Sequence, residues 1–337
     1  MTVLRGASWS LRYRPRVLVV VFALLLTAAA CAVVAIGSGD YPMSPPAVVR
    51  TLLGGGDPTD AYIVTQLRLP RAACALLAGA ALGLSGAVFQ SLSRNPLGSP
   101  DILGFTEGAA TGALLVIVIF TGGGTALALG ALTGGLACGG LLLALLWRHG
   151  VHGYRLVLTG IGISAILTGV NGYLLTRAQI SDAARAVLWL TGSLDGRQWT
   201  NAVPLAIGLV AMAPLVLALH RRLSALDLGD EPAAALGVNV RATRVSLLAA
   251  AVVLVSVAAA AVGPIAFVAL TAPQLARRLT GVSGPHLFSA MCMGAALLAA
   301  SDVAAQRLQL PVGVITGILG GAYLIGLLVT QGRRGRI

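Results

Sequence analysis

The side chains that could do chemistry are few. Glu107 and Asp302 are the acids that fall within long apolar runs, and a carboxylate at membrane depth is a group that ion-coupled transporters use. His149 and His152 have HxxH spacing, which lacks the third ligand that a metal site needs. The sequence contains no HExxH or GxSxG motif and no paired carboxylates. These residues predict neither a catalytic centre nor a metal site.

The basic residues limit how the chain could obtain energy. All 23 are arginines, and lysine is absent. A P-loop needs a lysine to reach the nucleotide phosphates, so this chain does not hydrolyse ATP by that route. A partner ATPase that binds ATP and Mg²⁺ is the first hypothesis, with no cofactor in this chain. Ion-coupled transport through Glu107 or Asp302 is the alternative, although both acids lie near the ends of their predicted helices.

The composition indicates whether the chain is surrounded by water or by lipid. Of 337 residues, 57% are hydrophobic and 10% charged, and the mean hydropathy is +0.90. Soluble domains carry about 25% charged residues. The apolar residues form continuous runs rather than the alternating segments of a β-barrel. We expect an all-α integral membrane protein with one transmembrane domain over 1–337.

Proline, glycine and arginine separate the apolar runs and predict ten transmembrane helices. The expected spans are 17–37, 69–92, 101–120, 125–147, 156–176, 201–220, 245–262, 264–279, 286–305 and 312–331. The first run follows four arginines, as a signal peptide does, but it is long enough to span and we interpret it as a retained helix.

The net charge of +12 predicts the orientation. Arginines concentrate on the cytoplasmic side of membrane proteins. With ten crossings and an inside N-terminus, most of the arginines fall in cytoplasmic segments, and both ends of the chain are arginine-rich. We therefore expect a multi-pass protein of the cytoplasmic membrane with both termini in the cytoplasm.

Two connecting segments differ from ordinary loops. Segment 221–244 is the longest cytoplasmic one, and within it Pro232 to Leu236 predicts a short helix with an acidic first turn and a glycine cap at Gly237. Such a helix suits docking to a partner, whereas a solvated connector is the alternative. On the outer side, 177–200 carries Trp189 and Trp199, which favours an interfacial or re-entrant helix.

Five stretches, in order, are similar to one family. They are LRLPRAACALLAGAALGLSGAVFQSLSRNPLGSPDILGFTEGA (67–109), WLTGSLDGRQW (189–199), LDLGDEPAAALGV (226–238), GPIAFVALTAPQLARRLTG (263–281) and LPVGVITGILGGAYLIGLL (310–328). The chain resembles the FecCD family, the permeases of bacterial ABC importers for iron-siderophores, haem and cobalamin.

This resemblance implies a type II ABC importer permease fold with an inverted repeat of helices 2–5 and 7–10. It implies two permeases, either two copies or this chain with a paralogue, over two ATPases, with an extracytoplasmic substrate-binding protein outside. The substrate could be a siderophore, haem or cobalamin; we expect an iron-siderophore because that substrate is common in the family.

The resemblance also implies roles for residues. Arg68 and Arg71 would dock acidic groups of the binding protein, as arginine forks suit carboxylates. Gln306 stands where the family has its third docking arginine, so Arg307 is the substitute candidate. Anchoring at the lipid headgroups is the alternative for Arg68 and Arg71.

On the cytoplasmic side, the resemblance implies a gate formed by Asn95 and Leu97 with the loop around Gly153 and Tyr154. An Asn-Pro turn is the structural alternative for Asn95. The resemblance also implies that five residues couple the permease to the ATPase: Gly229, Asp230, Glu231, Leu236 and Gly237. Gln274 and Glu107 depart from the family pattern.

Overall fold

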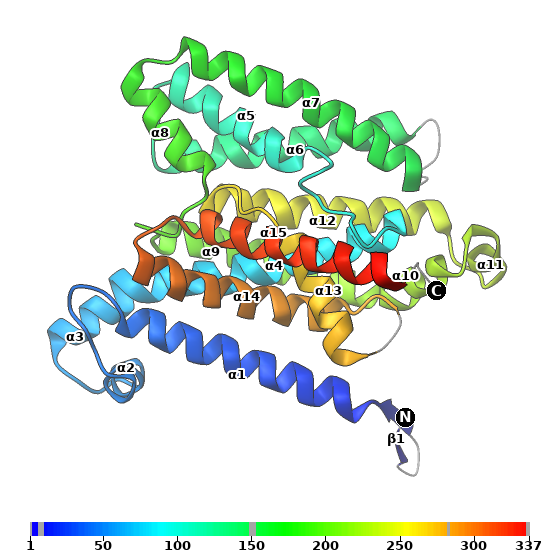
Figure 1. Cartoon of the computed structure of the whole chain (residues 1–337), viewed down its shortest axis with the longest axis horizontal. Coiled ribbons are helices and arrows are strands. Elements are labelled where there is room, and N and C mark those ends of the chain that lie inside the picture. Colours follow the sequence, from blue (N-terminus) through cyan, green and yellow to red (C-terminus); the bar gives the residue numbers. More distant parts are fainter. Residues whose placement is uncertain (1, 6–9, 148–152, 282–283, 335–337) are drawn as a thin grey trace.

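The long helices lie side by side along the horizontal direction of Figure 1. This computed structural model describes 2–5, 10–147, 153–281 and 284–334. Seven of its described helical segments are long and apolar enough to cross a membrane, and two shorter apolar helices accompany them. The prediction of an all-helical membrane fold is confirmed.

Helices occupy every one of the ten predicted segments. They are α1 (Pro15–Gly37), α4 (Leu69–Ser93), α5 (Phe105–Val118), α6 (Thr125–Trp147), α7 (Gly153–Arg177), α9 (Trp199–Ala218), α12 (Val240–Val262), α13 (Val268–Thr280), α14 (Leu287–Leu308) and α15 (Val312–Arg334).

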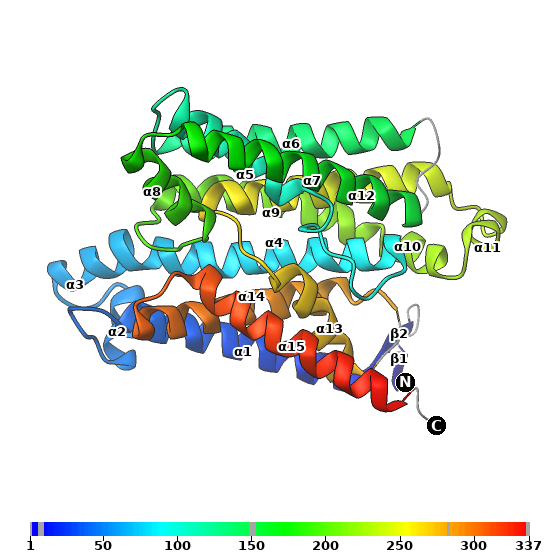
Figure 2. The same cartoon turned by 45° about the horizontal axis from the view of Figure 1, so that its top comes forward.

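Shorter elements lie at the two ends of the bundle. At one end are α2 (Pro45–Leu52), α3 (Pro58–Tyr62), the π-helical turn η1 (Ile63–Arg68) and α8 (Ile180–Leu190). At the opposite end are α10 (His220–Asp227), α11 (Asp230–Ala235) and the antiparallel strands β1 (Thr2–Arg5) and β2 (Ser10–Tyr13). The N and C labels both lie at this second end in Figures 1 and 2.

The helices form two sets with matching contacts. In the first set α4 packs on α12 and α13, α5 packs on α6 and α7, and α6 packs on α7. In the second set α12 packs on α4 and α5, α13 packs on α14 and α15, and α14 packs on α15. The contact between α4 and α14 corresponds to the contact between α12 and α6. The contact between α4 and α7 is the exception to this correspondence. This correspondence is what an inverted repeat of α4–α7 and α12–α15 produces.

Close approach of the helices depends on glycine. A Cβ on Gly83 would lie 2.3 Å from the Ala290 carbonyl oxygen of α14, and one on Gly86 would lie 1.8 Å from the Ala269 carbonyl oxygen of α13. In lipid, helices associate through such backbone contact because apolar burial gives no advantage there. The helix α4 is therefore at the centre of the packing, with α14, α12 and α13 directly against it.

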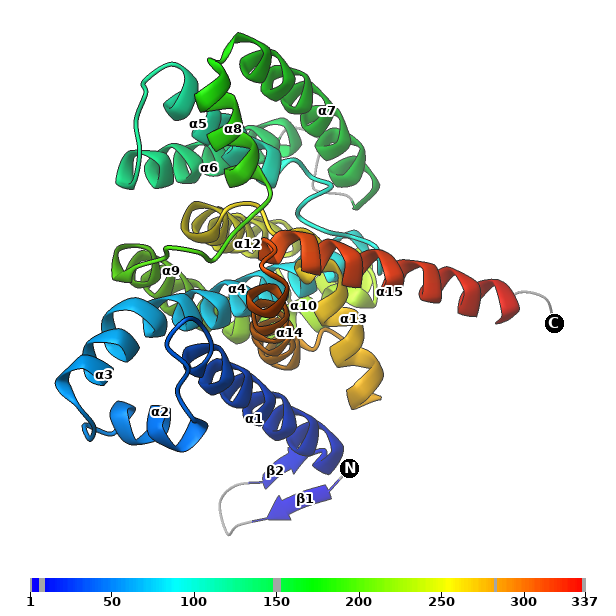
Figure 3. The ribbon, with the colours of Figure 1, turned by 60° about the vertical axis from the view of Figure 1, so that its left-hand side comes forward.

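α15 is the least enclosed of the second set. It packs on α14 and α13, with Arg278 of α13 over the Tyr323 ring at 5.2 Å, and its C-terminal part runs outward in Figure 3. Ile318 and Ile325 are among its exposed side chains.

Two predicted helices start later than expected. Residues 101–104 form turns, and α5 begins at Phe105 because Gly104 has φ 85°. The Asp101 carboxylate accepts hydrogen bonds from Ser99 and Thr106 at 3.0 and 2.8 Å, which holds this turn. The segment from Gly263 to Phe267 is also non-helical, so α13 does not begin at Pro264. Phe267 has φ 67°, a left-handed conformation, immediately before α13.

Two local predictions are corrected. α11 begins at Asp230 rather than at Pro232, because Gly229 with φ 126° is the last residue before the helix. Trp189 packs against protein and not against lipid: it is 8% exposed and packs with Ala109 and Ala260. Trp199 is half-exposed, and its indole nitrogen donates to the Thr65 carbonyl oxygen at 3.1 Å.

Candidate functional site

An open cavity lies at the end of the bundle that carries α2, α3 and α8. Its volume is about 690 Å³. Arg68, Arg71 and Arg307, predicted separately along the sequence, all line it. The end of α1, the start of α4, the α8–α9 loop and the end of α14 bring its walls together. The fold thus brings the three predicted docking arginines to one place.

Arg71 is the centre of an ion-pair network in this cavity. Its Nε and Nη2 donate to Oδ1 of Asp302 at 3.1 and 2.8 Å. Its Nη1 forms an ion pair with Asp195. Gln306, one turn along α14, donates to Oδ2 of Asp302 at 2.9 Å. The side chain of Asp302 is 1% exposed, so Arg71 neutralises a buried charge and is fixed by it.

Arg68 is bound to backbone instead. Its two terminal nitrogens donate to the carbonyl oxygens of Ile36 and Tyr41, both at 2.8 Å. Ile36 is in the last turn of α1, whose final carbonyl groups have no partner within the helix. Arg68 therefore joins the end of α1 to the start of α4. If Arg68 also docks a partner, the same side chain must serve both roles.

Arg307 differs from the other two because it is exposed. It lies one turn beyond Asp302 and next to Gln306, which is half-buried in the Arg71 network. The local sequence SDVAAQRL therefore places the Gln306 amide against the Asp302 carboxylate and the Arg307 charge at the rim of the cavity. Of the three arginines, Arg307 is the most exposed.

Two residues of this site were not predicted from the sequence. Asp195 and Arg197 line the cavity from the loop between α8 and α9, and Arg197 donates to the Ser193 carbonyl oxygen at 3.0 Å. Both are part of the stretch WLTGSLDGRQW (189–199). The two opposite charges, two residues apart within this motif, were the available signal.

At the other end of the bundle, two arginines converge on one carboxylate. Arg94, which follows α4, donates to Oδ1 of Asp230 at 2.9 Å and to the Leu226 carbonyl oxygen at 2.8 Å. Arg244 of α12 donates to Oδ2 and Oδ1 of Asp230 at 2.9 and 2.6 Å. An open cavity of about 490 Å³ lies beside this cluster. α11 is thus attached to both α4 and α12.

These bonds change the titration of Asp230. Partial burial raises its pKa, but the hydrogen bonds and charges of Arg244 and Arg94 outweigh it, and the pKa of Asp230 lies below its ordinary value. The neighbouring Asp227 shows the opposite: burial raises its pKa more than Arg277 and Arg94 lower it. Asp230 is consequently the charged anchor of this segment.

The predicted coupling residues divide into two groups. Gly229, Asp230 and Gly237 shape and attach α11: Gly229 and Gly237 have φ 126° and 80°, conformations that side chains other than glycine rarely adopt. Glu231 and Leu236 are exposed, Leu236 to 67%. An exposed acid on a short, well-attached helix and an exposed leucine directly after that helix form a surface that can contact another protein.

Two of the predicted gate residues, Asn95 and Leu97, lie close to this cluster. Asn95 follows Arg94 directly, and its side-chain oxygen accepts a hydrogen bond from the Leu97 backbone nitrogen at 2.9 Å, the Asx turn of the structural interpretation. Leu97 is half-exposed. Gly153 and Tyr154 begin α7; the placement of the Tyr154 side chain, and of the preceding loop with His149 and His152, is outside the described residues.

A buried amide pair supports the turn that carries Asn95. Gln274 of α13 donates to Oε1 of Gln90 at 2.6 Å and to the Pro96 carbonyl oxygen at 3.0 Å. Gln90 in turn donates to the Leu270 carbonyl oxygen at 2.9 Å. Sequence reasoning noted Gln274 as a departure from the family, and the fold uses it to attach α13 to the end of α4.

The two acids proposed for ion coupling have partners. Asp302 is held by Arg71 and Gln306, as described above. Glu107, in the first turn of α5, accepts a hydrogen bond from the Asn171 side-chain nitrogen of α7 at 2.8 Å. In the described part of the chain, no cluster of three or more His, Cys, Asp or Glu side chains could hold a metal ion.

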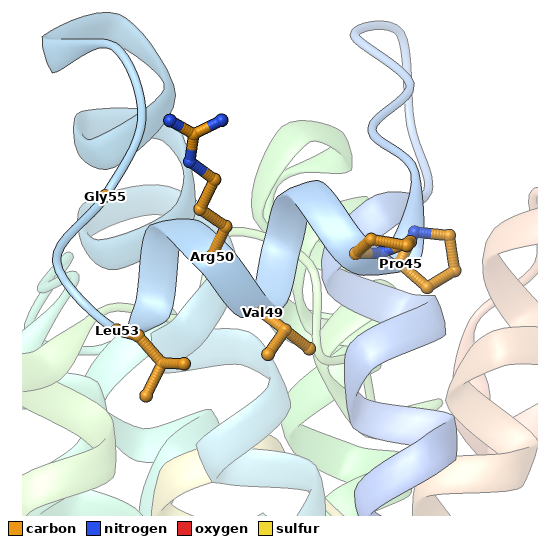
Figure 4. A pocket seen from close by; sticks show the side chains of 6 residues that line it. Pro45, Val49, Arg50, Leu53 and Gly55 are labelled. Carbon is orange, nitrogen blue, oxygen red and sulfur yellow. The ribbon is translucent and has the colours of Figure 1, made fainter.

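A second open cavity, about 700 Å³ in volume, borders the exposed side of α2. Figure 4 shows Val49 and Leu53 pointing to one side of this helix and Arg50 to the other. Val48 and Thr51 are buried against the protein. An apolar exposed side with one arginine is typical of a helix at a membrane surface, and no predicted site residue lines this cavity.

Comparison with known proteins matches the whole domain. The profile of the FecCD transport family matches residues 15–330. The chain is 44% identical to the ferric enterobactin transport system permease protein FepG of Escherichia coli (strain K12), over 92% of this chain and 96% of that protein. It is 36% identical to the Fe(3+)-citrate import system permease protein YfmE of Bacillus subtilis (strain 168), covering 95% and 97%.

A solved structure agrees with these matches. It is described as the inward-facing conformation of a "metal-chelate type ABC transporter", and it superposes on 93% of this chain and 99% of its own with a TM-score of 0.82 and 30% sequence identity.

Proposed function

The chain belongs to the FecCD transport family and is the permease subunit of an ABC importer, and on that premise we propose that it moves a ferric siderophore across the cytoplasmic membrane. The 44% identity with a ferric enterobactin permease over nearly the full length of both chains carries this proposal. The relatives that import ferric citrate support a ferric chelate as the substrate class.

The chain is not an enzyme, and the ATP that drives transport is bound by a partner ATPase. An ABC permease also works with a substrate-binding protein. We infer that a second permease, either another copy of this chain or a paralogue, completes the pathway, and that lipid covers the exposed apolar helices.

The orientation follows from the charge distribution. We propose that the end with α10, α11 and both termini faces the cytoplasm. Arginines are enriched there in segment 221–244 and at both ends of the sequence, as the positive-inside tendency requires. The opposite end, with α2, α3, α8 and the Arg71 cavity, then faces outward.

At the outer end we propose that Arg307 and Arg71 receive acidic side chains of the binding protein, with Arg68 in a mainly supporting role. Arg307 is exposed at the rim, Arg71 is 23% exposed, and Arg68 is bound to the carbonyl oxygens of Ile36 and Tyr41. Arginine forks recognise carboxylates in two-point contacts, and opposed charges set the orientation of docking.

At the cytoplasmic end we propose that the segment 221–244 contacts the ATPase through Glu231 and Leu236, and that Gly229, Asp230 and Gly237 fix its shape. The proposal of a gate formed by Asn95, Leu97, Gly153 and Tyr154 is supported by the position of the Asn95 turn next to the Arg94–Asp230 contact.

Substrate choice is tested by uptake of radiolabelled iron in a strain that lacks this permease. Restoring the permease should restore uptake of a ferric siderophore while leaving haem-iron and cobalamin uptake unchanged. Restoration of cobalamin uptake, or of haem-iron uptake alone, would refute the siderophore assignment. Uptake that persists with an inactive ATPase but stops with an uncoupler would instead favour ion coupling through Glu107 or Asp302.

Docking and coupling are tested separately. Arg307→Glu should weaken binding of the substrate-binding protein without affecting membrane insertion, and unchanged affinity would contradict its docking role. Glu231→Arg or Gly237→Trp should lower transport per ATP hydrolysed. Normal co-purification with the ATPase together with normal transport would refute the coupling assignment.

A further inference from the structure

We propose that Asp195 is an internal competitor for the binding protein: it occupies the part of Arg71 that a docked acidic side chain would take, and docking displaces it. This inference rests on the proposed docking role of Arg71. It adds a residue that sets the affinity of docking and that none of the docking predictions included.

The two carboxylates on Arg71 occupy different parts of its guanidinium. Asp302 is bound by Nε and Nη2, at 3.1 and 2.8 Å to the same oxygen. Asp195 is paired with Nη1, the remaining terminal nitrogen. An acidic group that arrives from outside therefore finds Nη1 already taken.

The burial of the two acids decides which one gives way. The Asp302 side chain is 1% exposed and the Asp195 side chain is 68% exposed. Displacing Asp302 would leave a buried carboxylate without its cation, which is strongly unfavourable. Displacing Asp195 returns an exposed carboxylate to water, and exposed pairs of this kind contribute little. Asp195 is the acid that exchanges.

The loop geometry allows this exchange without moving the backbone. The start of the loop is fixed, since the Ser193 backbone nitrogen donates to the Val262 carbonyl oxygen at 3.0 Å. The Asp195 carboxylate also accepts a hydrogen bond from the Ser193 hydroxyl at 3.3 Å, and its side chain is 68% exposed. In the proposed exchange this side chain rotates about its own bonds and frees Nη1.

A second cation is available to the displaced carboxylate. Arg197 lines the same cavity, and the charge of Asp195 acts on it. The Asp195 carboxylate can thus move from Arg71 toward Arg197 while an external carboxylate binds Nη1.

The experiment uses the substrate-binding protein that supports uptake through this permease, loaded with its ferric chelate. It measures the binding of this protein to the complete permease–ATPase complex in lipid nanodiscs. Asp195→Asn should tighten binding about two- to five-fold, the factor expected from removing a competing exposed ion pair. A structural role for Asp195 would weaken binding instead.

Two controls separate competition from a general charge effect. Asp57→Asn removes another exposed acid at the same end of the bundle and should leave the affinity unchanged. In an Arg71→Gln background, Asp195→Asn should have no effect because the contested nitrogen is gone.

The outcomes distinguish the two proposals. Unchanged or weaker binding of Asp195→Asn, equal tightening by Asp57→Asn, or tightening that persists without Arg71 would each overturn the competitor role. If Arg71→Gln itself binds normally, the docking role of Arg71 fails first, and the competitor role fails with it.

Discussion

Arg94 donates a hydrogen bond to Oδ1 of Asp230 at 2.9 Å and thereby connects the end of α4 to the first turn of α11. The two residues are far apart in the sequence, and Arg94 is followed directly by Asn95, a predicted gate residue. This contact is a direct hydrogen-bonded link between the proposed ATPase surface and the segment that carries the proposed gate.

We predict that Arg94→Met leaves ATP hydrolysis by the assembled complex intact and lowers transport roughly ten-fold, because a hydrogen bond to a charged group contributes about 1.5 kcal/mol or more. Transport and hydrolysis are measured together in proteoliposomes. Arg94→Lys, which keeps the charge, is the control and should retain more transport. Equal loss of hydrolysis and transport would contradict a transmitting role.

Asp230 should make attachment of α11 sensitive to acid. Its folded pKa lies below the ordinary value because Arg244 and Arg94 outweigh the opposing effect of burial. A depressed carboxylate contributes stability above its unfolded pKa of about 3.9, and the contribution is lost as the pH falls through the folded value. Protease cleavage in 228–237 should therefore increase below about pH 4. In Asp230→Asn the cleavage should be higher near neutral pH and insensitive to acid; a matching acid response in this variant would exclude Asp230 as the titrating group.

Asp302→Ala should destabilise the protein by about 3 kcal/mol, since it leaves Arg71 without the partner that fixes it. The thermal unfolding midpoint in detergent measures this. Replacing both partners, in Arg71→Met with Asp302→Leu, should recover most of the stability because an apolar pair of similar volume needs no compensating charge. The double variant should still fail to bind the substrate-binding protein. A double variant as unstable as Asp302→Ala would show that the pair itself is required.

Gly86→Ala should prevent close packing of α4 on α13. The added methyl group would lie 1.8 Å from the Ala269 carbonyl oxygen, and overpacking costs about 1–3 kcal/mol or more. Gly169→Ala on α7 is the matched control, because its methyl group would meet no atom within 4 Å. We expect a lower unfolding midpoint for Gly86→Ala alone; equal midpoints would contradict the tight α4–α13 contact.

Several local features could be predicted because they depend on neighbouring residues alone. Apolar runs such as 17–37 and 245–262 must be helical to satisfy their backbone in lipid, and helices are found there. Start positions were less predictable. The late starts of α5 and α13 depend on Gly104 and Phe267 in left-handed conformations, and a non-glycine residue in that conformation leaves little trace in the sequence.

The sequence by itself determined that this is an arginine-rich, lysine-free helical membrane protein, and its ordered motifs determined the family. Both are local or linear properties, set by the cost of placing polar groups in hydrocarbon and by residue order. The tertiary structure decided which charges meet. Arg71 and Asp302 are 231 positions apart, and Arg94 and Asp230 are 136 apart. The first pair exists because α4 packs against α14, and the second because α10, which directly precedes α11, packs against α4. Such pairing depends on the arrangement of helices and not on the composition of any one of them.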